Sequence, residues 1–313
     1  MQILVIGDIH GCLAELYELL DAAALGSDDV IISLGDLIDR GPDSPGVLHF
    51  FRTHPRARAI QGNHERKHVR ALRGLVRPAL SQQITRRRFE EHGDALYDDA
   101  IAWMDALPRF IDLPDALLVH GFFEPGVPLT SQRENVLVGT MTGEKWIRAR
   151  CGGRPWYKLY DGDKPLVVGH LDYLRNGQPL VWRNRVYGID TACVQGGRLT
   201  GLILPAFRVV SVPAQKNWWN EERRCAVDLR YADNLLEALS FDALRAQTEV
   251  GGERGRAARA LLEHAEVALV TLHGQIACTH AAIRAGLAEG AAFGSLAPAD
   301  RPAVMQRPWL LTP

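Results

Sequence analysis

Short apolar runs rich in β-branched residues alternate with stretches of helical apolar spacing over the first two thirds of the chain. This alternation predicts an α/β layered fold over residues 2–212. The predicted strands are Gln2–Ile6, Val30–Leu34, Ala57–Ile60, Ala116–Val119, Pro165–Val168, Gln178–Trp182, Val186–Ile189, Leu199–Leu204 and Phe207–Val212. The predicted helices are Leu13–Ala24, Gly46–Thr53, Glu65–Arg73 and Ser81–Met104.

The later strands follow one another without intervening helices, and the turn signals Asn176-Gly177 and Gly196-Gly197 separate some of them. This arrangement predicts an antiparallel or mixed portion of sheet. After Pro213 the strand pattern stops, and Ala257–Leu287 has helical spacing of apolar residues. We therefore expect a domain over residues 1–212 and an α-helical extension over 213–313, whose role the sequence leaves open. A Gly-rich, charged break at Thr248–Arg256 is expected to separate two helical pieces.

The composition is that of an ordinary globular protein. The 313 residues include 36 Lys+Arg and 37 Asp+Glu, with a formal net charge of -1, and 47% are hydrophobic. These values exclude disordered, collagen-like and histone-like chains. The five cysteines are scattered without a Cys-x-x-Cys pair, so neither a disulfide framework nor a cysteine zinc site is expected. No apolar stretch reaches the ~20 residues that span a bilayer, and we expect a cytoplasmic protein without membrane contact.

Chemically active side chains follow the predicted strands at the point where each strand ends. Asp8 and His10 lie in Gly7–Gly11 after the first strand, and residues two apart in an extended segment point the same way. Gly35–Gly41, which contains Asp36 and Asp39, follows the second strand, and Gly62–Glu65 follows the third. Because ligands bind at the carboxyl ends of strands in open α/β sheets, these side chains are expected at one edge.

Two further histidines, His120 and His170, each close a predicted strand beside a glycine. The candidate ligands are then Asp8, His10, Asp36, Asn63, His120 and His170. Imidazoles combined with carboxylate and amide oxygens suit Mn²⁺, Fe or Zn²⁺. Six ligands are too many for one open catalytic ion and fit two ions, provided that one carboxylate bridges them.

The three motifs resemble those of the calcineurin-like metallophosphoesterases, in the phosphoprotein phosphatase branch. Gly-Asp-x-His-Gly, Gly-Asp-x-x-Asp-Arg-Gly and Gly-Asn-His-Glu occur without substitution at Gly7–Gly11, Gly35–Gly41 and Gly62–Glu65. The resemblance covers about residues 1–212. The run Gly188–Cys193 is more similar to bacterial members, which include diadenosine tetraphosphatase-like enzymes and RNA-repair phosphatases.

The resemblance implies a two-sheet α/β/β/α sandwich that holds two divalent ions, most simply Mn²⁺. Asp8 and His10 would bind the first ion, Asp36 would bridge, and Asn63, His120 and His170 would bind the second. A hydroxide bridging the two ions would attack phosphorus directly. His64 would be the general acid, oriented by Asp39, and Arg40 would bind phosphate with its planar fork of donors. Asn63 would also contact substrate.

This sequence departs from the family pattern in two places. Gly121–Pro125 replaces a glycine-rich run after His120, and Leu171-Asp172 stands where a threonine is common after His170. Both changes leave the ligands intact and are expected to reshape the substrate pocket. The family has a second phosphate-binding arginine, for which Arg133 and Arg148 are candidates that the sequence does not separate.

The leading functional interpretation is phosphomonoester hydrolysis of the Ser/Thr protein phosphatase kind. The first alternative is a dinucleoside polyphosphate hydrolase or a nucleic-acid-end phosphatase or 2′,3′-cyclic phosphodiesterase. A basic run after the third motif, from Arg66 to Arg88, supports it, because Arg66, Arg70, Arg73 and Arg77 would share one helix face if the helix continues through Gly74. The second is a catalytically silent binding module, against which the complete ligand set argues. The expected partner is a phosphorylated substrate, and the oligomeric state is left open.

Overall fold

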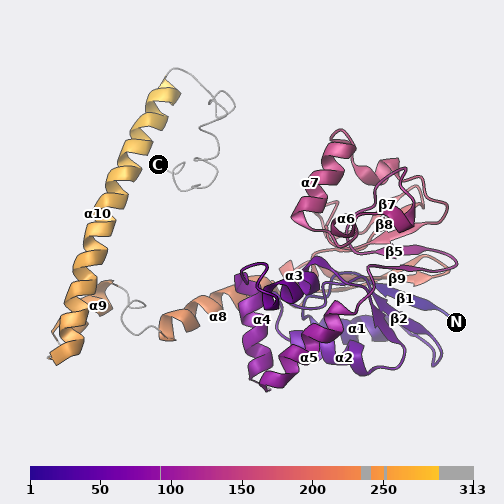
Figure 1. Ribbon diagram of the computed structural model, residues 1–313, viewed down its shortest axis with the longest axis horizontal. Helices are drawn as coiled ribbons and strands as arrows, with labels where there is room; N and C mark the ends of the chain where they lie inside the picture. Colours follow the sequence, from indigo (N-terminus) through magenta and orange to yellow (C-terminus); the bar gives the residue numbers. More distant parts are fainter. Residues whose placement is uncertain (92, 234–240, 250–251, 289–313) are drawn as a thin grey trace. The chain divides into compact units, whose positions relative to one another are not determined.

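The computed structural model describes residues 1–91, 93–233, 241–249 and 252–288 (Figure 1). The chain divides into two compact units, Met1–Val227 and Asp228–Pro313. The strands are β1 (Ile3–Ile6), β2 (Val30–Ser33), β3 (Ala57–Ala59), β4 (Phe110–Asp112), β5 (Leu117–Val119), β6 (Leu166–Val168), β7 (Leu180–Trp182), β8 (Val186–Gly188), β9 (Arg198–Leu204) and β10 (Arg208–Pro213). The helices of the first unit are α1 (Leu13–Ala23), α2 (Ser44–Thr53), α3 (Asn63–Leu72), α4 (Leu80–Glu90), α5 (Asp94–Asp105), α6 (Glu134–Leu137) and α7 (Met141–Arg150), with 3₁₀ turns η1 (Leu129–Ser131), η2 (Trp156–Leu159) and η3 (Cys193–Gln195).

Two five-stranded mixed sheets form the frame of this unit. The first has the order β10-β9-β1-β2-β3, in which β1, β2 and β3 are parallel and β9 is antiparallel to both neighbours. The second has the order β4-β5-β6-β8-β7, in which β5, β6 and β8 are parallel and the two edge strands are antiparallel. The mixed character predicted for the later strands is thereby confirmed.

The two sheets pack face to face, and helices cover their outer faces (Figure 1). In β1, Leu4 and Ile6 belong to the core beneath α1 and α2, while Val5 packs with residues of the second sheet such as Leu118 and Val167. Because side chains alternate along a strand, a strand covered on both faces is apolar throughout. This is the predicted α/β/β/α sandwich.

Some predicted elements differ from the observed ones. The single helix expected over Ser81–Met104 is two helices, α4 and α5, with Gly93 at φ 126° between them. Helix α3 ends at Leu72, and Gly74 has φ 69°, so Arg77 does not continue the helical face of Arg66 and Arg70. Strand β4 and helices α6 and α7 have no counterpart among the predictions. Strand β4 has three residues and α6 has four, and such short elements depend on tertiary packing.

The helical character expected after Pro213 is confirmed for the described residues. Helix α8 (Trp218–Asp233) begins in the first unit, where Trp218 and Trp219 pack against the core beneath α1. The second unit contains α9 (Phe241–Thr248) and α10 (Gly252–Ala288), joined by an Arg245–Glu266 ion pair of 3.2 Å. Among the described helices, none combines the length and the apolar character needed to cross a membrane. The predicted boundary at residue 212, between a domain over residues 1–212 and an extension over 213–313, remains a prediction.

Candidate dinuclear metal centre and active site

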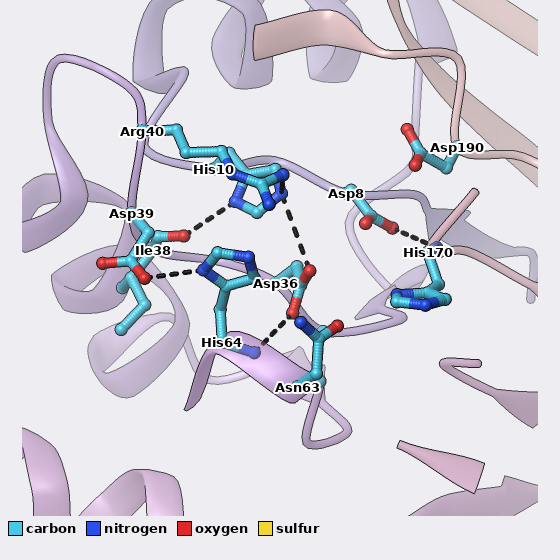
Figure 2. Close-up of polar contacts among 12 residues, drawn as sticks. Asp8, His10, Asp36, Ile38, Asp39, Arg40, Asn63, His64, His170 and Asp190 are labelled. Atoms are coloured by element: carbon cyan, nitrogen blue, oxygen red, sulfur yellow. Dashed lines mark hydrogen bonds and ion pairs between the residues drawn. The ribbon is translucent and has the colours of Figure 1, made fainter. Parts of the chain in front are cut away.

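The predicted ligands meet at the carboxyl ends of parallel strands from both sheets (Figure 2). Asp8 and His10 follow β1, Asp36 follows β2, and Asn63 opens α3 after β3. His120 and His170 follow β5 and β6 of the second sheet. The site therefore lies where the ends of two packed sheets converge, and segments more than 150 residues apart come together, as in the His170 N–H that donates to Asp8 Oδ1 at 2.9 Å.

The backbone at these strand ends is unusual. His10, Asp36, Asp39, Arg40 and His170 all have positive φ, between 48° and 74°. Left-handed conformations cost a non-glycine residue on the order of 1 kcal/mol each, and such residues cluster at functional sites. The surrounding sheet edges hold all five site residues in this conformation. The left-handed backbone turns their side chains out of the strand direction and toward one another.

Two groups of potential ligands share Asp36. His10, Asp36 and His64 form one group, and Asp36, His120 and His170 form the other, with ligand atoms within 4.8 Å of one another in each. Asp36 Oδ2 lies 3.6 Å from His10 Nε2, and Asp36 Oδ1 lies 3.4 Å from His120 Nε2. The two carboxylate oxygens thus face the two histidines separately, which is the arrangement that a bridging carboxylate requires.

Backbone carbonyls orient the imidazoles. His10 Nδ1 lies 2.8 Å from Ile38 O, and His120 Nδ1 lies 2.9 Å from Leu34 O. Because a carbonyl only accepts hydrogen bonds, Nδ1 carries a proton in both rings, and in the neutral His10 ring Nε2 keeps its lone pair on the side of Asp36. Metal-binding histidines in proteins are commonly oriented in this way.

The charges at the site favour a cation. Burial and the nearby carboxylate of Asp190 raise the pKa of Asp8 well above its ordinary value. Burial opposes the charged form of His120, but Asp36 and Asp8 outweigh it and raise its pKa to about 10. Burial lowers the pKa of both His10 and His170 to about 3, so these rings are neutral. Crowded carboxylates beside imidazoles form a donor set suited to divalent ions, so the residues present fit a dinuclear centre.

A histidine–carboxylate pair adjoins this centre. His64 Nδ1 lies 2.6 Å from Asp39 Oδ2, and the His64 backbone N–H donates to Asp36 Oδ1 at 3.0 Å. Burial opposes ionisation of Asp39, yet His68 and His64 hold the pKa of this carboxyl well below its ordinary value. The negative carboxylate fixes the His64 ring with Nδ1–H toward Asp39, which leaves Nε2 for a reacting group. Arg40 Nη1 lies 3.1 Å from His10 Nε2, so its guanidinium reaches the same site.

The two candidate arginines lie in the segment between β5 and β6. The Arg133 guanidinium lies 4.0 Å from the centroid of the Trp146 ring, and its Nε is 3.5 Å from Glu124 Oε1. Arg148 lies exposed on α7. Among the contacts of the described residues, neither arginine touches the metal ligands, His64 or Arg40. Their role in substrate binding remains a prediction.

Comparison with known proteins extends this picture. The family model of the calcineurin-like phosphoesterases matches residues 1–190. The chain belongs to this family. A relative from Anoxybacillus flavithermus named bis(5'-nucleosyl)-tetraphosphatase PrpE (asymmetrical) is 32% identical, over 70% of this chain and 97% of the relative. A protein of the same name from Halalkalibacterium halodurans is 31% identical, over 72% and 98%. A solved structure of a candidate diadenosine tetraphosphatase is 28% identical, with a TM-score of 0.54, over 68% and 93%.

Family membership makes this chain a metal-dependent phosphoric ester hydrolase with a dinuclear divalent metal centre. The resemblance drawn from the three motifs is confirmed. The identity of the ions stays open, with Mn²⁺ as the expectation and Fe or Zn²⁺ as alternatives.

Several residues of this phosphoesterase site are absent from the sequence-based set. Asp190 lies beside Asp8 (Figure 2), and burial raises its pKa to about 6. It follows β8 by two residues, so the strand-end signal that identified Asp8 would have found it. Glu65 accepts hydrogen bonds from the backbone N–H groups of Asp36, Leu37 and Gly62 and ties two ligand loops together.

A separate buried group joins α1 to the start of the C-terminal extension. Cys12, Glu15 and Cys193 have side-chain ligand atoms within 4.8 Å of one another. A hydrogen bond to Cys193, together with burial, raises the pKa of the Cys12 thiol, so it is neutral. Glu15 Oε1 accepts hydrogen bonds from the Gln215 backbone N–H at 3.0 Å and from Trp218 Nε1 at 2.7 Å. We assign this group to packing.

Two glycines provide a matched test of the second metal position. Gly139 and Gly126 have φ of 68° and 70°, but a Cβ on Gly139 would lie 2.8 Å from the His170 ring, whereas Gly126 has no neighbour within 4 Å. Both alanine variants should lose stability by about 1–2 kcal/mol from backbone strain. Only Gly139→Ala should also lower the affinity for the second metal ion, by about tenfold or more, because its Cβ displaces His170. Isothermal titration with Mn²⁺ compares them, and equal affinities would contradict this placement of His170.

Proposed function

We propose that this phosphoesterase hydrolyses dinucleoside polyphosphates, with diadenosine tetraphosphate as the representative substrate. The observation that carries the proposal is the identity of 31–32% to proteins named as asymmetrical bis(5'-nucleosyl)-tetraphosphatases, over 97–98% of their length. This substrate was the alternative in the sequence analysis, and the relatives favour it over the Ser/Thr protein phosphatase interpretation.

The arrangement of side chains supports such a hydrolysis. In the asymmetrical reaction, water adds to one phosphorus, a bridging P–O bond breaks, and AMP and ATP are the products. Two divalent ions held by the six ligands would supply an activated water and neutralise charge on the phosphoryl oxygens. Arg40 offers two parallel donors to the phosphoryl group, and the fixed His64 ring places Nε2 to protonate the leaving oxygen.

The basic run presents less unpaired positive charge than its sequence suggests. Five arginines of the run form ion pairs, namely Arg66–Glu134, Arg73–Asp105, Arg86–Glu90, Arg87–Glu91 and Arg88–Glu222. The exposed pairs are weak, but each removes net positive charge from the face that was expected to attract nucleic acid. The nucleic-acid-end alternative is therefore less well supported than the dinucleotide.

Phosphomonoester hydrolysis is kept as a second candidate because of the His64–Asp39 pair. An alkoxide leaving group needs a proton in the transition state, whereas a polyphosphate leaves more readily without one. A buried, oriented acid is therefore an observation that favours alkyl phosphates as additional substrates.

The substrate class is tested by Mn²⁺-dependent hydrolysis of diadenosine tetraphosphate, a phosphoserine peptide and a 2′,3′-cyclic nucleotide in parallel. We expect kcat/KM to favour the dinucleotide by about a hundredfold or more, which equals about 2.7 kcal/mol of transition-state preference. A comparable preference for the peptide would establish the protein phosphatase interpretation instead. Absence of hydrolysis of all three by the metal-loaded protein would support the silent binding module.

A further inference from the structure

The carboxylate of Asp39 accepts more hydrogen bonds than the pairing with His64 requires. Its Oδ1 lies 2.8 Å from His68 Nε2 and accepts from Thr85 Oγ1 at 2.8 Å. Its Oδ2 lies 2.6 Å from His64 Nδ1 and accepts from Ser81 Oγ at 3.4 Å. The Asp39 side chain is fully buried. Each oxygen therefore has its own pair of donors.

His68 is the buried centre of this arrangement. It lies on α3 four residues after His64, so both rings project from one face of the helix toward Asp39. Its second nitrogen, Nδ1, lies 2.8 Å from the Tyr97 hydroxyl on α5. The ring is 0% exposed, and it sits between a carboxylate that only accepts and a phenol.

The hydrogen-bonding capacities of these groups determine the tautomer of His68. Because the Asp39 carboxylate only accepts, Nε2 of His68 carries a proton. Burial raises the pKa of Tyr97 to about 12, so its hydroxyl keeps its proton and donates it to Nδ1. Tyr97, His68, Asp39 and His64 then form a continuous series of hydrogen bonds in which both histidines donate to Asp39, and Nε2 of His64 remains free at its end.

We propose that His68, oriented by Tyr97, is a positioning residue for this phosphoesterase. It holds Asp39 Oδ1 so that Oδ2 keeps the His64 ring aimed at the leaving oxygen. The inference rests on the acid role of His64 in the proposed function. The sequence alone does not distinguish His68 from an ordinary structural histidine, and the contact with Asp39 is what does so.

The test measures kcat and KM separately on phenyl phosphate and p-nitrophenyl phosphate with Mn²⁺. Phenolate is the poorer leaving group and depends more on an acid than the more acidic nitrophenol does. His68→Leu keeps the apolar volume and removes the donor, while His68→Gln restores an N–H near the position of Nε2. His49→Leu, at an exposed histidine on α2, is the matched control.

We expect His68→Leu to lower kcat on phenyl phosphate by about 10- to 100-fold, with little change in KM and less than about threefold loss on p-nitrophenyl phosphate. His68→Gln should recover most of the loss, and Tyr97→Phe should show a smaller loss in the same direction. Equal losses on both substrates, or no better activity for Gln than for Leu, would overturn the proposal and leave His68 a packing residue.

A spectroscopic measurement tests the same chain without turnover. ¹⁵N shifts of the histidine rings should show His68 protonated at Nε2 alone, and Tyr97→Phe should change the Nδ1 shift of His68 by removing its hydrogen bond, while His49→Leu should not. A proton on Nδ1 of His68 in the wild type would contradict the inference. If the wild type cleaves both aryl phosphates but not diadenosine tetraphosphate, only the proposed substrate class fails. If it cleaves neither, the acid role and the positioning role fail together.

Discussion

Asp36→Asn should empty or weaken both metal positions and lower kcat/KM by about a thousandfold or more. Asp36 belongs to both ligand groups, so it is the carboxylate that both ions would share. Two ions contribute several kcal/mol to the stabilisation of phosphoryl transfer, which sets the magnitude. Asparagine is the suitable replacement because Asp36 has φ 50°, and asparagine tolerates the left-handed region. The amide oxygen also remains able to accept the His64 backbone N–H.

The measurement is metal content by elemental analysis after dialysis, together with the thermal midpoint of unfolding. Asp21→Asn, at an exposed position on α1, is the control and should retain two ions per chain. Two ions bound to Asp36→Asn as tightly as to the wild type would refute the bridging assignment. An unfolding midpoint well below that of the metal-free wild type would show that the loss of metal reflects misfolding, and Asp8→Asn would then provide the second test, with loss of one ion expected.

His64→Ala should lower kcat on an alkyl phosphate by about 10²–10⁴-fold while the metal content stays near that of the wild type. The loss of activity is expected because Asp39 orients the His64 ring through Nδ1. The metal content is expected to persist because alanine keeps the backbone N–H that donates to Asp36. On p-nitrophenyl phosphate the loss should be much smaller, since that leaving group departs without protonation.

The ratio of the two losses is the informative quantity for His64. Similar losses on alkyl and nitrophenyl phosphates would show that His64 binds substrate or metal and does not act as an acid. His64 also lies within 4.8 Å of ligand atoms of His10 and Asp36, so metal content must be measured on the same samples. His49→Ala is the control and should leave both rates unchanged.

The predictable parts of the molecule are those with local signals. Apolar runs that are covered on both faces identify β1, β2 and β6, and the polar residues directly after them identify Asp8, Asp36 and His170. Local signals were weaker for α4 and α5, where the helical pattern continues through Gly93, and for β4, which has three residues. Such short elements form because neighbours bury them, and their own sequence carries little preference.

The partners of the site residues could not be predicted from the sequence for a different reason. His120 is oriented by Leu34 O, 86 residues away, and Asp39 meets Thr85, 46 residues away. Neither a carbonyl nor a threonine has a distinguishing pattern in the sequence. His68 looks like any other histidine until its distance to Asp39 is known.

The sequence by itself determined the layered α/β architecture and, through the resemblance of its motifs, the phosphoesterase family. It also predicted the six candidate ligand positions and the His64–Asp39 pair, because the motifs are short, contiguous and tied to strand ends. Only the tertiary structure decided which candidate ligands share Asp36, which atoms the histidine nitrogens face and which further groups hold Asp39. These features depend on distances of about 3 Å between segments that only the packing of the two sheets brings together.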